Sequence, residues 1–273
     1  MPTSMLETLR QVRRNCQLSQ LELSLRLGVS QRHISFVESG RSKPSRDLLV
    51  AWLQELNTPL IVRNEIMLQA GYAPVYNTAQ LNDPTLTHVN HALQQLLSAH
   101  DPQPALVIDA QWNLVRINRG GQWLAAALMP GMSASEGDTP INFLDMLIHP
   151  EGLTQSITNL HEVGPAFLTR LRHEASTQPC ITPKVDAFAA LLDARLGVQY
   201  PQKTFQKKFQ ETESFPAAPI LTTSYATQYG ELSFFSMFTT FGTPQDITLE
   251  SLRVEHMFAA DKTTHAVLRE QVQ

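Results

Sequence analysis

Polar side chains suited to reading DNA bases are concentrated between residues 19 and 43. Gln31 and Arg32 lie in what we predict to be the first turn of a helix, where base edges come within reach. Glutamine can form two hydrogen bonds with adenine, and arginine can do the same with guanine. Gln20 at a preceding helix start, and the cations Arg41 and Lys43, are suited to phosphate groups. The candidate DNA-contacting residues are Gln20, Ser30, Gln31, Arg32, Ser35, Arg41 and Lys43.

The segment from residue 19 to residue 40 has the signals of two short helices joined by a tight turn. Ser19 followed by Glu22 forms a capping-box pattern, and Ser30 is placed to cap a second helix. Gly28 lies where the chain must adopt a left-handed conformation. The buried helix faces are predicted to comprise Leu23, Leu27, Ile34 and Val37. This pattern predicts a helix-turn-helix, whose second helix enters the major groove of DNA.

The same segment resembles the Cro/CI-type (XRE) helix-turn-helix of phage repressors and bacterial regulators. The alternative is a helical hairpin that does not contact DNA. Ser24 departs from the family pattern, which usually has alanine there, but serine is small enough for the packing to survive. The matching residues are Ser19, Gln20, Leu23, Gly28, Val29, Ser30, Ile34, Glu38, Gly40 and Pro44.

Length and composition limit the class of protein. A chain of 273 residues with 42% apolar residues is long enough for two domains with separate cores. It has no apolar run of the length that a membrane span needs, and its first residues do not resemble a signal peptide. Cys16 and Cys180 are far apart, so we expect ordinary thiols in a cytoplasmic protein and no zinc site.

The charge is distributed unevenly along the chain. The net charge is −4, but residues 1–76 carry nine basic and six acidic residues, whereas the remainder carries 12 and 19. The basic surplus therefore coincides with the predicted DNA-binding segment, where phosphates would attract it. Because a surplus of +3 is modest, we expect a homodimer that binds two half-sites of a double-stranded operator.

Apolar periodicity predicts three further helices around this motif, over residues 3–15, from Ser45 to Leu56, and over residues 60–70. On the last of these, Ile61, Ile66 and Leu68 are expected to face inward. In the first, Arg10, Arg13 and Arg14 either contact phosphate or are solvated, and the sequence does not decide between these. Five helices would complete a compact repressor-type domain that is mainly α-helical.

The segment Gly71–Asn77 resembles the joint found in XRE regulators that carry an MmyB-like ligand-binding domain. That resemblance implies a PAS-like α+β domain with an antiparallel sheet. We expect a DNA-binding domain over residues 1–76, a linker and coupling helix over 77–100, and the ligand-binding domain over 101–273. Strands are predicted at 104–109, 114–118, 220–227, 230–241 and 249–258. Helices are predicted at 86–99, 119–128, 153–175 and 183–196, and a helical or frayed tail is predicted after residue 261. Residues 130–140 are predicted to form a loop, and residues 203–213 a loop or an edge strand.

The resemblance also implies that the second domain binds a small apolar molecule, with fatty-acid-like ligands a known kind of occupant. An acyl carboxylate needs a cation, and Arg116, Arg119, Arg170 and Arg172 are the candidates. The alternatives are ordinary core packing for each aromatic residue and a solvated face for each arginine. The candidate ligand-binding residues are Trp112, Arg116, Asn118, Trp123, Phe143, Phe167, Arg170, Phe234 and Phe238.

No catalytic or cofactor motif is recognisable. The chain has no GxSxG, HExxH, P-loop or GxGxxG sequence, and its histidines lack the spacing of metal ligands. We therefore expect no enzyme, no metal and no cofactor other than a bound apolar ligand. Two hypotheses remain: a ligand-responsive transcription factor, or a DNA-binding protein whose second domain binds a protein partner, as in an antitoxin or adaptor. The first predicts a cavity, and the second predicts an open apolar patch.

Overall fold

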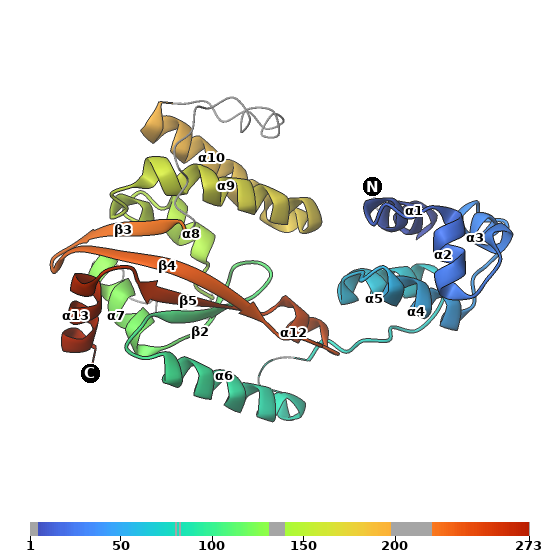
Figure 1. Cartoon of the computed structure of the whole chain (residues 1–273), viewed down its shortest axis with the longest axis horizontal. Coiled ribbons are helices and arrows are strands. Elements are labelled where there is room, and N and C mark those ends of the chain that lie inside the picture. The colour runs from blue at the N-terminus through green and yellow to red at the C-terminus, as the bar shows by residue number, and fades with distance from the viewer. Residues whose placement is uncertain (1–4, 80, 82, 131–139, 198–219, 273) are drawn as a thin grey trace. The chain divides into compact units, whose positions relative to one another are not determined.

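The computed structural model describes residues 5–79, 81, 83–130, 140–197 and 220–272 (Figure 1). Contacts divide the chain into two units. The first comprises Met1–Leu86 together with Phe241–Glu250, and the second comprises Thr87–Thr240 together with Ser251–Gln273. The short segment at 241–250 thus belongs to the first unit although it lies between two strands of the second.

The first unit has five helices before its linker: α1 (Met5–Asn15), α2 (Gln20–Leu27), α3 (Gln31–Glu38), α4 (Arg46–Glu55) and α5 (Leu60–Gln69). Their apolar faces meet in one core that includes Leu9, Leu23, Ile34, Leu49 and Trp52. Ser24 is buried in this unit, and its hydroxyl donates a hydrogen bond to the carbonyl of Leu21 over 2.7 Å. The predicted five-helix domain is confirmed.

The turn between α2 and α3 has the predicted geometry. The hydroxyl of Ser19 accepts a hydrogen bond from the Glu22 amide, and the Glu22 carboxylate accepts one from the Ser19 amide, which completes the capping box. Gly28 ends α2 with φ of +65°, a value that costs a residue with a side chain more than it costs glycine. Ser30 caps α3 by accepting from the His33 amide. Local sequence signals therefore fix the entry of α3.

A buried ion pair joins α1 to α3. Arg13 donates to both carboxylate oxygens of Glu38, over 2.7 and 3.0 Å, and Gln20 donates to the same carboxylate over 2.7 Å. Burial opposes ionisation of Glu38, but these hydrogen bonds outweigh it and lower the pKa of the carboxyl. Arg10 donates to the backbone carbonyl of Glu38. Arg13 is thus buried and paired, so the expectation that it contacts phosphate or solvent was wrong.

The orientation of α5 also differs from the prediction. Ile66 is buried, but Ile61 and Leu68 are 53% and 58% exposed, because Leu60 and Met67 occupy the buried face together with Ile66. Ile61 and Leu68 are seven residues apart and therefore share one exposed face of the helix.

The segment at 241–250 is attached to the linker and to the start of α5. Asn77 forms a parallel bridge with Asp246, and the Asp246 carboxylate accepts a hydrogen bond from the Ala79 amide over 3.0 Å. Glu250 accepts from the Leu60 amide over 2.7 Å. Pro59 cannot cap α5 with its own side chain, so Glu250 supplies a carboxylate to that helix N-terminus.

The second unit is built on a five-stranded antiparallel sheet with the strand order β2-β1-β5-β4-β3. The strands are β1 (Ala105–Ile108), β2 (Leu114–Ile117), β3 (Thr222–Thr227), β4 (Gly230–Thr240) and β5 (Arg253–Ala259). β5 is central, and β3, β4 and β5 form the predicted meander. The α+β class of this domain is confirmed.

Helices cover both faces of this sheet. α6 (Thr87–His100) packs on one face, where the His100 ring contacts His256 and Phe258 of β5. The opposite side carries Glu255 and Met257, which line a cavity together with residues of α7 (Arg119–Leu128) and α8 (Phe143–Ile148). The described part of the second unit also contains α9 (Leu160–Thr177), α10 (Thr182–Leu196) and α13 (Lys262–Gln271), with 3-10 turns at Leu153–Gln155 and Pro179–Ile181. Another 3-10 turn, Pro84–Leu86, precedes α6.

Two predicted elements differ in extent. The helix predicted from residue 153 begins at Leu160, because residues 156–158 pair with the edge strand β3 through an Ile157–Tyr225 bridge. The strand predicted from residue 249 begins at Arg253, because Asp246 caps the short helix α12 (Ile247–Ser251). Most of the predicted loop at 130–140 and all of that at 203–213 lie outside the described residues.

We expect Arg13→Met to lower the free energy of unfolding by about 3 kcal/mol, because it leaves a buried carboxylate without its cation. Thermal and urea unfolding would measure this. The pKa of Glu38 is lowered by folding, so its stabilising contribution is present above the pKa of an unfolded glutamate and lost as the pH falls through the folded value.

The matched control is Arg26→Met, which removes the exposed pair with Glu55 and should cost about 1 kcal/mol or less. Equal losses in both variants would contradict a structural role for the buried pair.

Candidate functional site

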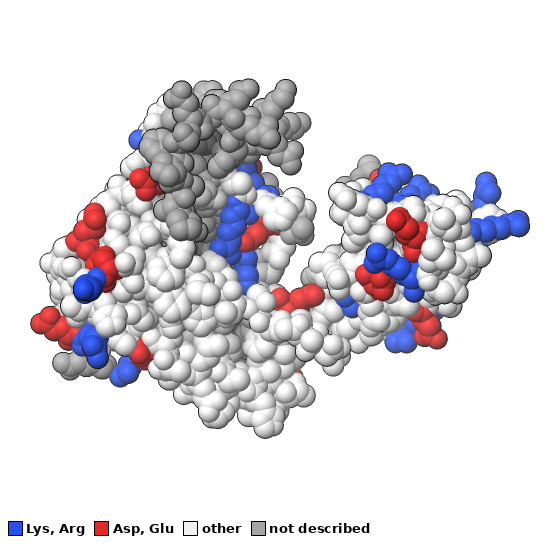
Figure 2. All heavy atoms as spheres, viewed as in Figure 1, with Lys and Arg blue, Asp and Glu red and all other residues white. Residues whose placement is uncertain are grey.

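The exposed surface of the helix-turn-helix carries most of the predicted DNA-contacting residues. Gln31 and Arg32 are exposed in the first turn of α3, and Ser35 is half-buried one turn later. Figure 2 shows Lys and Arg side chains projecting at the end of the unit where Figure 1 places α2 and α3. This is the arrangement that a recognition helix requires, with its N-terminal residues free to reach base edges.

Aromatic rings support the cations near this surface. The guanidinium groups of Arg32 and Arg41 lie 5.0 and 5.9 Å from the centroid of the Phe36 ring, so one ring contacts both. The ammonium group of Lys43 lies 4.9 Å from the ring of Tyr72. Such contacts restrict long side chains without neutralising them. The three cations therefore remain available for DNA in a partly ordered arrangement.

Two of the residues predicted to contact DNA also stabilise the helix-turn-helix itself. The side-chain amide of Gln20 donates to Glu38, so this residue braces the buried ion pair at the same time as it opens α2. The Ser30 hydroxyl is occupied in capping α3. The DNA contacts of both residues stay predictions.

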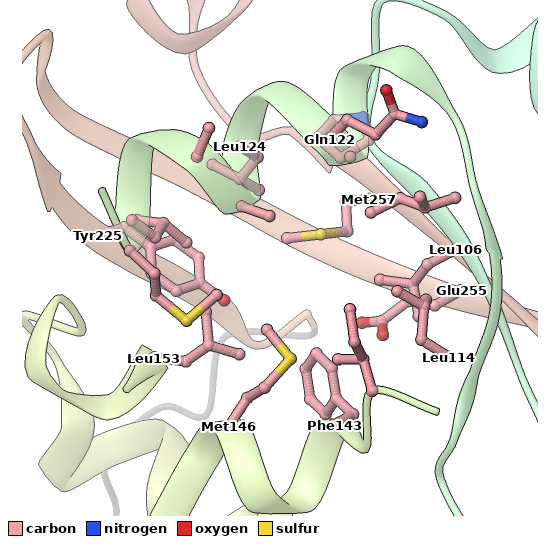
Figure 3. Close-up of a pocket in the computed structure, with 18 residues that line it drawn as sticks. Leu106, Leu114, Gln122, Leu124, Phe143, Met146, Leu153, Tyr225, Glu255 and Met257 are labelled. Carbon is pink, nitrogen blue, oxygen red and sulfur yellow. The ribbon is translucent and has the colours of Figure 1, made fainter. Parts of the chain in front are cut away.

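The second unit contains a cavity of about 570 Å³ between the sheet and helices α7 and α8. Its wall is largely aliphatic, with contributions from Leu106 on β1, Leu124 on α7 and Met146 on α8 (Figure 3). Gly121 on α7 also lines it, and a Cβ atom there would collide with the side chain of Ile117. Such a volume with few polar groups is typical of a site for an apolar small molecule.

Polar groups in this wall are few and come mainly from the sheet. Gln122, Tyr225 and Glu255 are the lining residues with polar side chains, and Tyr225 and Glu255 point into the cavity from the sheet (Figure 3). Burial raises the pKa of Glu255, although the Ser236 hydroxyl and the charges of Arg170 and Arg253 oppose the shift. Burial and the neighbouring Glu255 raise the pKa of the Tyr225 hydroxyl as well, so that group stays neutral.

A second cavity of about 280 Å³ adjoins the first on the side of α9. Phe143, Tyr225 and Glu255 line both cavities, and Phe167, Arg170 and Phe238 line only the second. The Arg170 guanidinium lies 3.8 Å from the centroid of the Phe238 ring. The second cavity therefore supplies a cation that the first lacks among its lining residues.

Arg170 is held by Glu174, which lies at the centre of a half-buried polar cluster. The Glu174 carboxylate accepts from Arg253 over 2.7 Å, from Arg170 over 3.0 Å, and from the Trp112 indole N–H over 3.0 Å. Burial opposes its ionisation, but the hydrogen bond and charge of Arg253, then those of Arg170, outweigh burial and lower the pKa of Glu174. Glu174 is therefore an anion that orients both arginines.

The structure brings together only part of the predicted ligand site. Phe143, Phe167, Arg170 and Phe238 line the cavities, whereas the remaining five residues line neither. Trp112 and Phe234 are buried core residues, Asn118 caps α7, Trp123 packs on Tyr229, and Arg116 donates to Asn90 at the surface. Of the other proposed anchors, Arg119 is exposed and pairs with Asp101, and Arg172 lines neither cavity.

Sequence reasoning missed Tyr225, Glu255 and Met257. Strand alternation could have placed Glu255 and Met257 on the same face of β5, since they are two residues apart. It could not have shown that this face borders a cavity.

The described residues contain neither a candidate metal site nor a membrane-spanning helix. No group of three or more His, Cys, Asp or Glu side chains there could hold a metal ion. Nor does any helix of the described ranges combine the length and apolar character needed to cross a membrane.

Known family models match parts of both units. A family model described as the MmyB-like transcription regulator ligand binding domain matches residues 89–270, which is more than half of the chain. The chain belongs to this family. A helix-turn-helix model matches residues 9–62 of the same MmyB-like regulator. The protein is therefore a DNA-binding transcription regulator with a ligand-binding domain, and its resemblance to XRE regulators is confirmed.

Other comparisons add little to this assignment. No curated protein matches the sequence of this chain. One solved structure, an RNA-binding light-oxygen-voltage receptor, matches 97% of this chain with 14% identity and a TM-score of 0.27, and the chain covers 63% of that receptor. A similarity this low carries no argument about fold or function.

We expect Arg32→Ala and Arg41→Ala to weaken DNA binding in different ways. Loss of Arg32 should cost about 1–3 kcal/mol and relax the preference at one base pair, as should loss of Gln31, because these side chains are placed to read base edges. Loss of Arg41 should weaken binding to all sequences alike and flatten its salt dependence, because it is placed to contact phosphate.

Binding assays with operator variants at several salt concentrations would separate these effects. Selective loss of one sequence in Arg41→Ala, or unchanged specificity in Arg32→Ala, would reverse the assigned roles.

Proposed function

We propose that this regulator binds a double-stranded operator as a cytoplasmic homodimer and that a fatty-acid-like ligand in the second unit controls this binding. The observation that carries the proposal is the aliphatic cavity of about 570 Å³ between the sheet and helices α7 and α8. A cavity of that size leaves many apolar atoms without packing partners, and an apolar ligand would supply those contacts. A function in binding a protein partner would instead call for an open apolar patch.

An acid head group is the natural polar end for such a ligand. Arg170 lines the adjoining cavity, and Glu174 and the ring of Phe238 restrict its position. Guanidinium groups bind carboxylates with more than one hydrogen bond, so an anchor at Arg170 with the tail in the larger cavity accounts for both volumes. Arg170 is the one sequence-predicted arginine among the described lining residues.

The connection between β4 and β5 offers a route from ligand to DNA. Both strands contribute cavity residues, such as Phe238 and Glu255, and the segment that joins them belongs to the first unit. There Glu250 caps α5, and Asp246 binds the linker at Ala79. A ligand that shifts β4 against β5 would therefore act on the N-terminus of α5 through covalent continuity and these hydrogen bonds.

Two observations support a dimer. The first 76 residues carry a basic surplus of only +3, so one copy should bind DNA weakly. In addition, α5 exposes Ile61 and Leu68 on one face, and a second copy could cover that face.

We expect Met257→Trp to weaken binding of the apolar ligand, because this side chain points into the larger cavity and the bulkier indole would take space from the ligand. Native mass spectrometry of the wild type should show a dimer with about one lipid-sized ligand per chain, which denaturing extraction would identify. The variant should show the dimer with less of the added mass.

Met237→Trp is the control, because Met237 lies on β4 and is 55% exposed. It should retain the ligand. Ligand-free wild-type protein that also fails to bind acyl lipids would contradict the proposal and favour a protein partner.

We also expect Glu250→Ala to reduce the effect of ligand on DNA affinity, because the variant loses the carboxylate that joins the β4–β5 connection to α5. DNA affinity would be measured with and without saturating ligand, and a tenfold wild-type effect should fall to about twofold or less. Glu270→Ala, which alters an exposed glutamate on α13, should keep the full effect. An unchanged ligand effect in Glu250→Ala would exclude this route.

A further inference from the structure

The two cavities meet at a shared wall whose polar members are Tyr225 and Glu255. Phe143 is the third residue that lines both. Glu255 lies on β5, the central strand, opposite Leu106 of β1 and Phe238 of β4. Its nearest neighbours across the sheet are thus apolar, and its carboxyl group faces the volume that a ligand would occupy (Figure 3).

The charges near this wall do not sum to zero when Glu255 is neutral. Arg170 from α9 and Arg253 from β5 share the single carboxylate of Glu174. These three groups carry a net charge of +1. An ionised Glu255 would balance that charge, whereas a protonated Glu255 leaves it without a balancing carboxylate among the described residues that line the cavities, which favours an anion there.

The surroundings of Glu255 favour its neutral form. The titratable or charged groups that face it are Arg170 and Glu174 from α9, Arg253 from its own strand, and Tyr225 from β3. β1 and β4 contribute Leu106, Phe238 and the hydroxyl of Ser236, and α8 contributes Phe143. Burial among these groups raises the pKa of Glu255 despite both arginines.

We propose that Glu255 is the head-group residue of the ligand site, where it stands as a neutral acid and donates a hydrogen bond to an anionic head group that faces Arg170. A protonated carboxyl can donate, whereas an ionised one would repel a carboxylate at the same wall. When Glu255 is ionised in the free protein, it takes one proton from solvent as the anion enters. The anion then balances the charge of the arginine cluster. This inference rests on the proposed function, because it assumes that an apolar ligand enters these cavities.

The proposal predicts selection by charge. A saturated acid should bind better than an alcohol of equal length, and an amine of that length should bind worst, because its cation would face two arginines. Dodecanoate, 1-dodecanol and dodecylamine are suitable probes, since they share one tail and differ in head group. Calorimetric titration of the full chain with each probe would give the affinities.

The test for the proton is the pH dependence of dodecanoate binding between pH 6 and pH 9, where the probe itself stays largely ionised. The wild-type affinity should fall with rising pH, by up to tenfold per unit once Glu255 ionises in the free protein. Glu255→Gln is nearly isosteric and keeps a donor but cannot ionise. It should bind dodecanoate with an affinity that does not depend on pH and that equals the low-pH wild-type value.

A second variant tests the cation independently. Arg170→Met should weaken dodecanoate binding at least tenfold and leave 1-dodecanol binding unchanged, with circular dichroism to verify the fold. A wild-type dodecanoate affinity that does not change with pH, or an equal pH dependence in Glu255→Gln, would overturn the role of Glu255. If dodecanol binds as well as dodecanoate at every pH, the cavity is an apolar site without a head-group residue. If no probe binds at all, the proposed function itself fails.

Discussion

The ligand-binding unit depends on one half-buried carboxylate, that of Glu174. A cavity removes the dense packing that elsewhere fixes the positions of neighbouring elements, so directional interactions must hold its walls apart. Glu174 joins α9 to β5 through Arg253 and to the β1–β2 turn through Trp112. Trp112 itself has a φ of +66°, an unfavourable conformation for a residue with a side chain, which the surrounding contacts must maintain. Trp112, Arg170 and Arg253 donate to this half-buried carboxylate and favour its ionised form, so removal of any one of them would leave its partial burial less well compensated.

The first unit was predictable because its signals are local. Ser19, Glu22, Gly28 and Ser30 act on residues within one helical turn, so their types and spacing determine the turn between α2 and α3 without reference to the rest of the chain. Arg13 was not predictable in the same way. Its partner Glu38 is 25 residues away, and an arginine on an amphipathic helix looks the same in sequence whether it is solvated or buried. The helices could thus be predicted from sequence, but not the ion pair that joins them.

The second unit shows the limit of aromatic residues as markers of a ligand site. Trp112 and Phe234 were selected for their size, and both are core residues, whereas much of the larger cavity is lined by leucine and methionine, which are equally common in any core. The strands and the antiparallel meander of β3, β4 and β5 were predicted from the sequence, whereas the position of β1 beside β5 was not. Whether a face of β5 packs against a helix or borders an empty volume depends on distances between α7, α8 and α9, and no local pattern encodes these. Pairing of residues 156–158 with β3 is of the same kind, since the apolar spacing there favours a helix until the edge strand is present.

The free energy of a single hydrogen bond in this molecule is large enough for a ligand to change DNA affinity about tenfold. A ligand that changes DNA affinity tenfold needs a coupling free energy of about 1.4 kcal/mol between the two sites. A hydrogen bond to a charged group contributes about 1.5–3 kcal/mol, so the bond from the Leu60 amide to Glu250 is sufficient in size to carry that coupling. β4 and β5 both line the smaller cavity and also hold the two ends of the segment that contains Glu250, so in the proposed switch a change in their spacing would alter this bond. Such a switch would not require the whole sheet to rearrange. The free energy of one hydrogen bond at the N-terminus of α5 is as large as the coupling free energy that a tenfold change in DNA affinity requires.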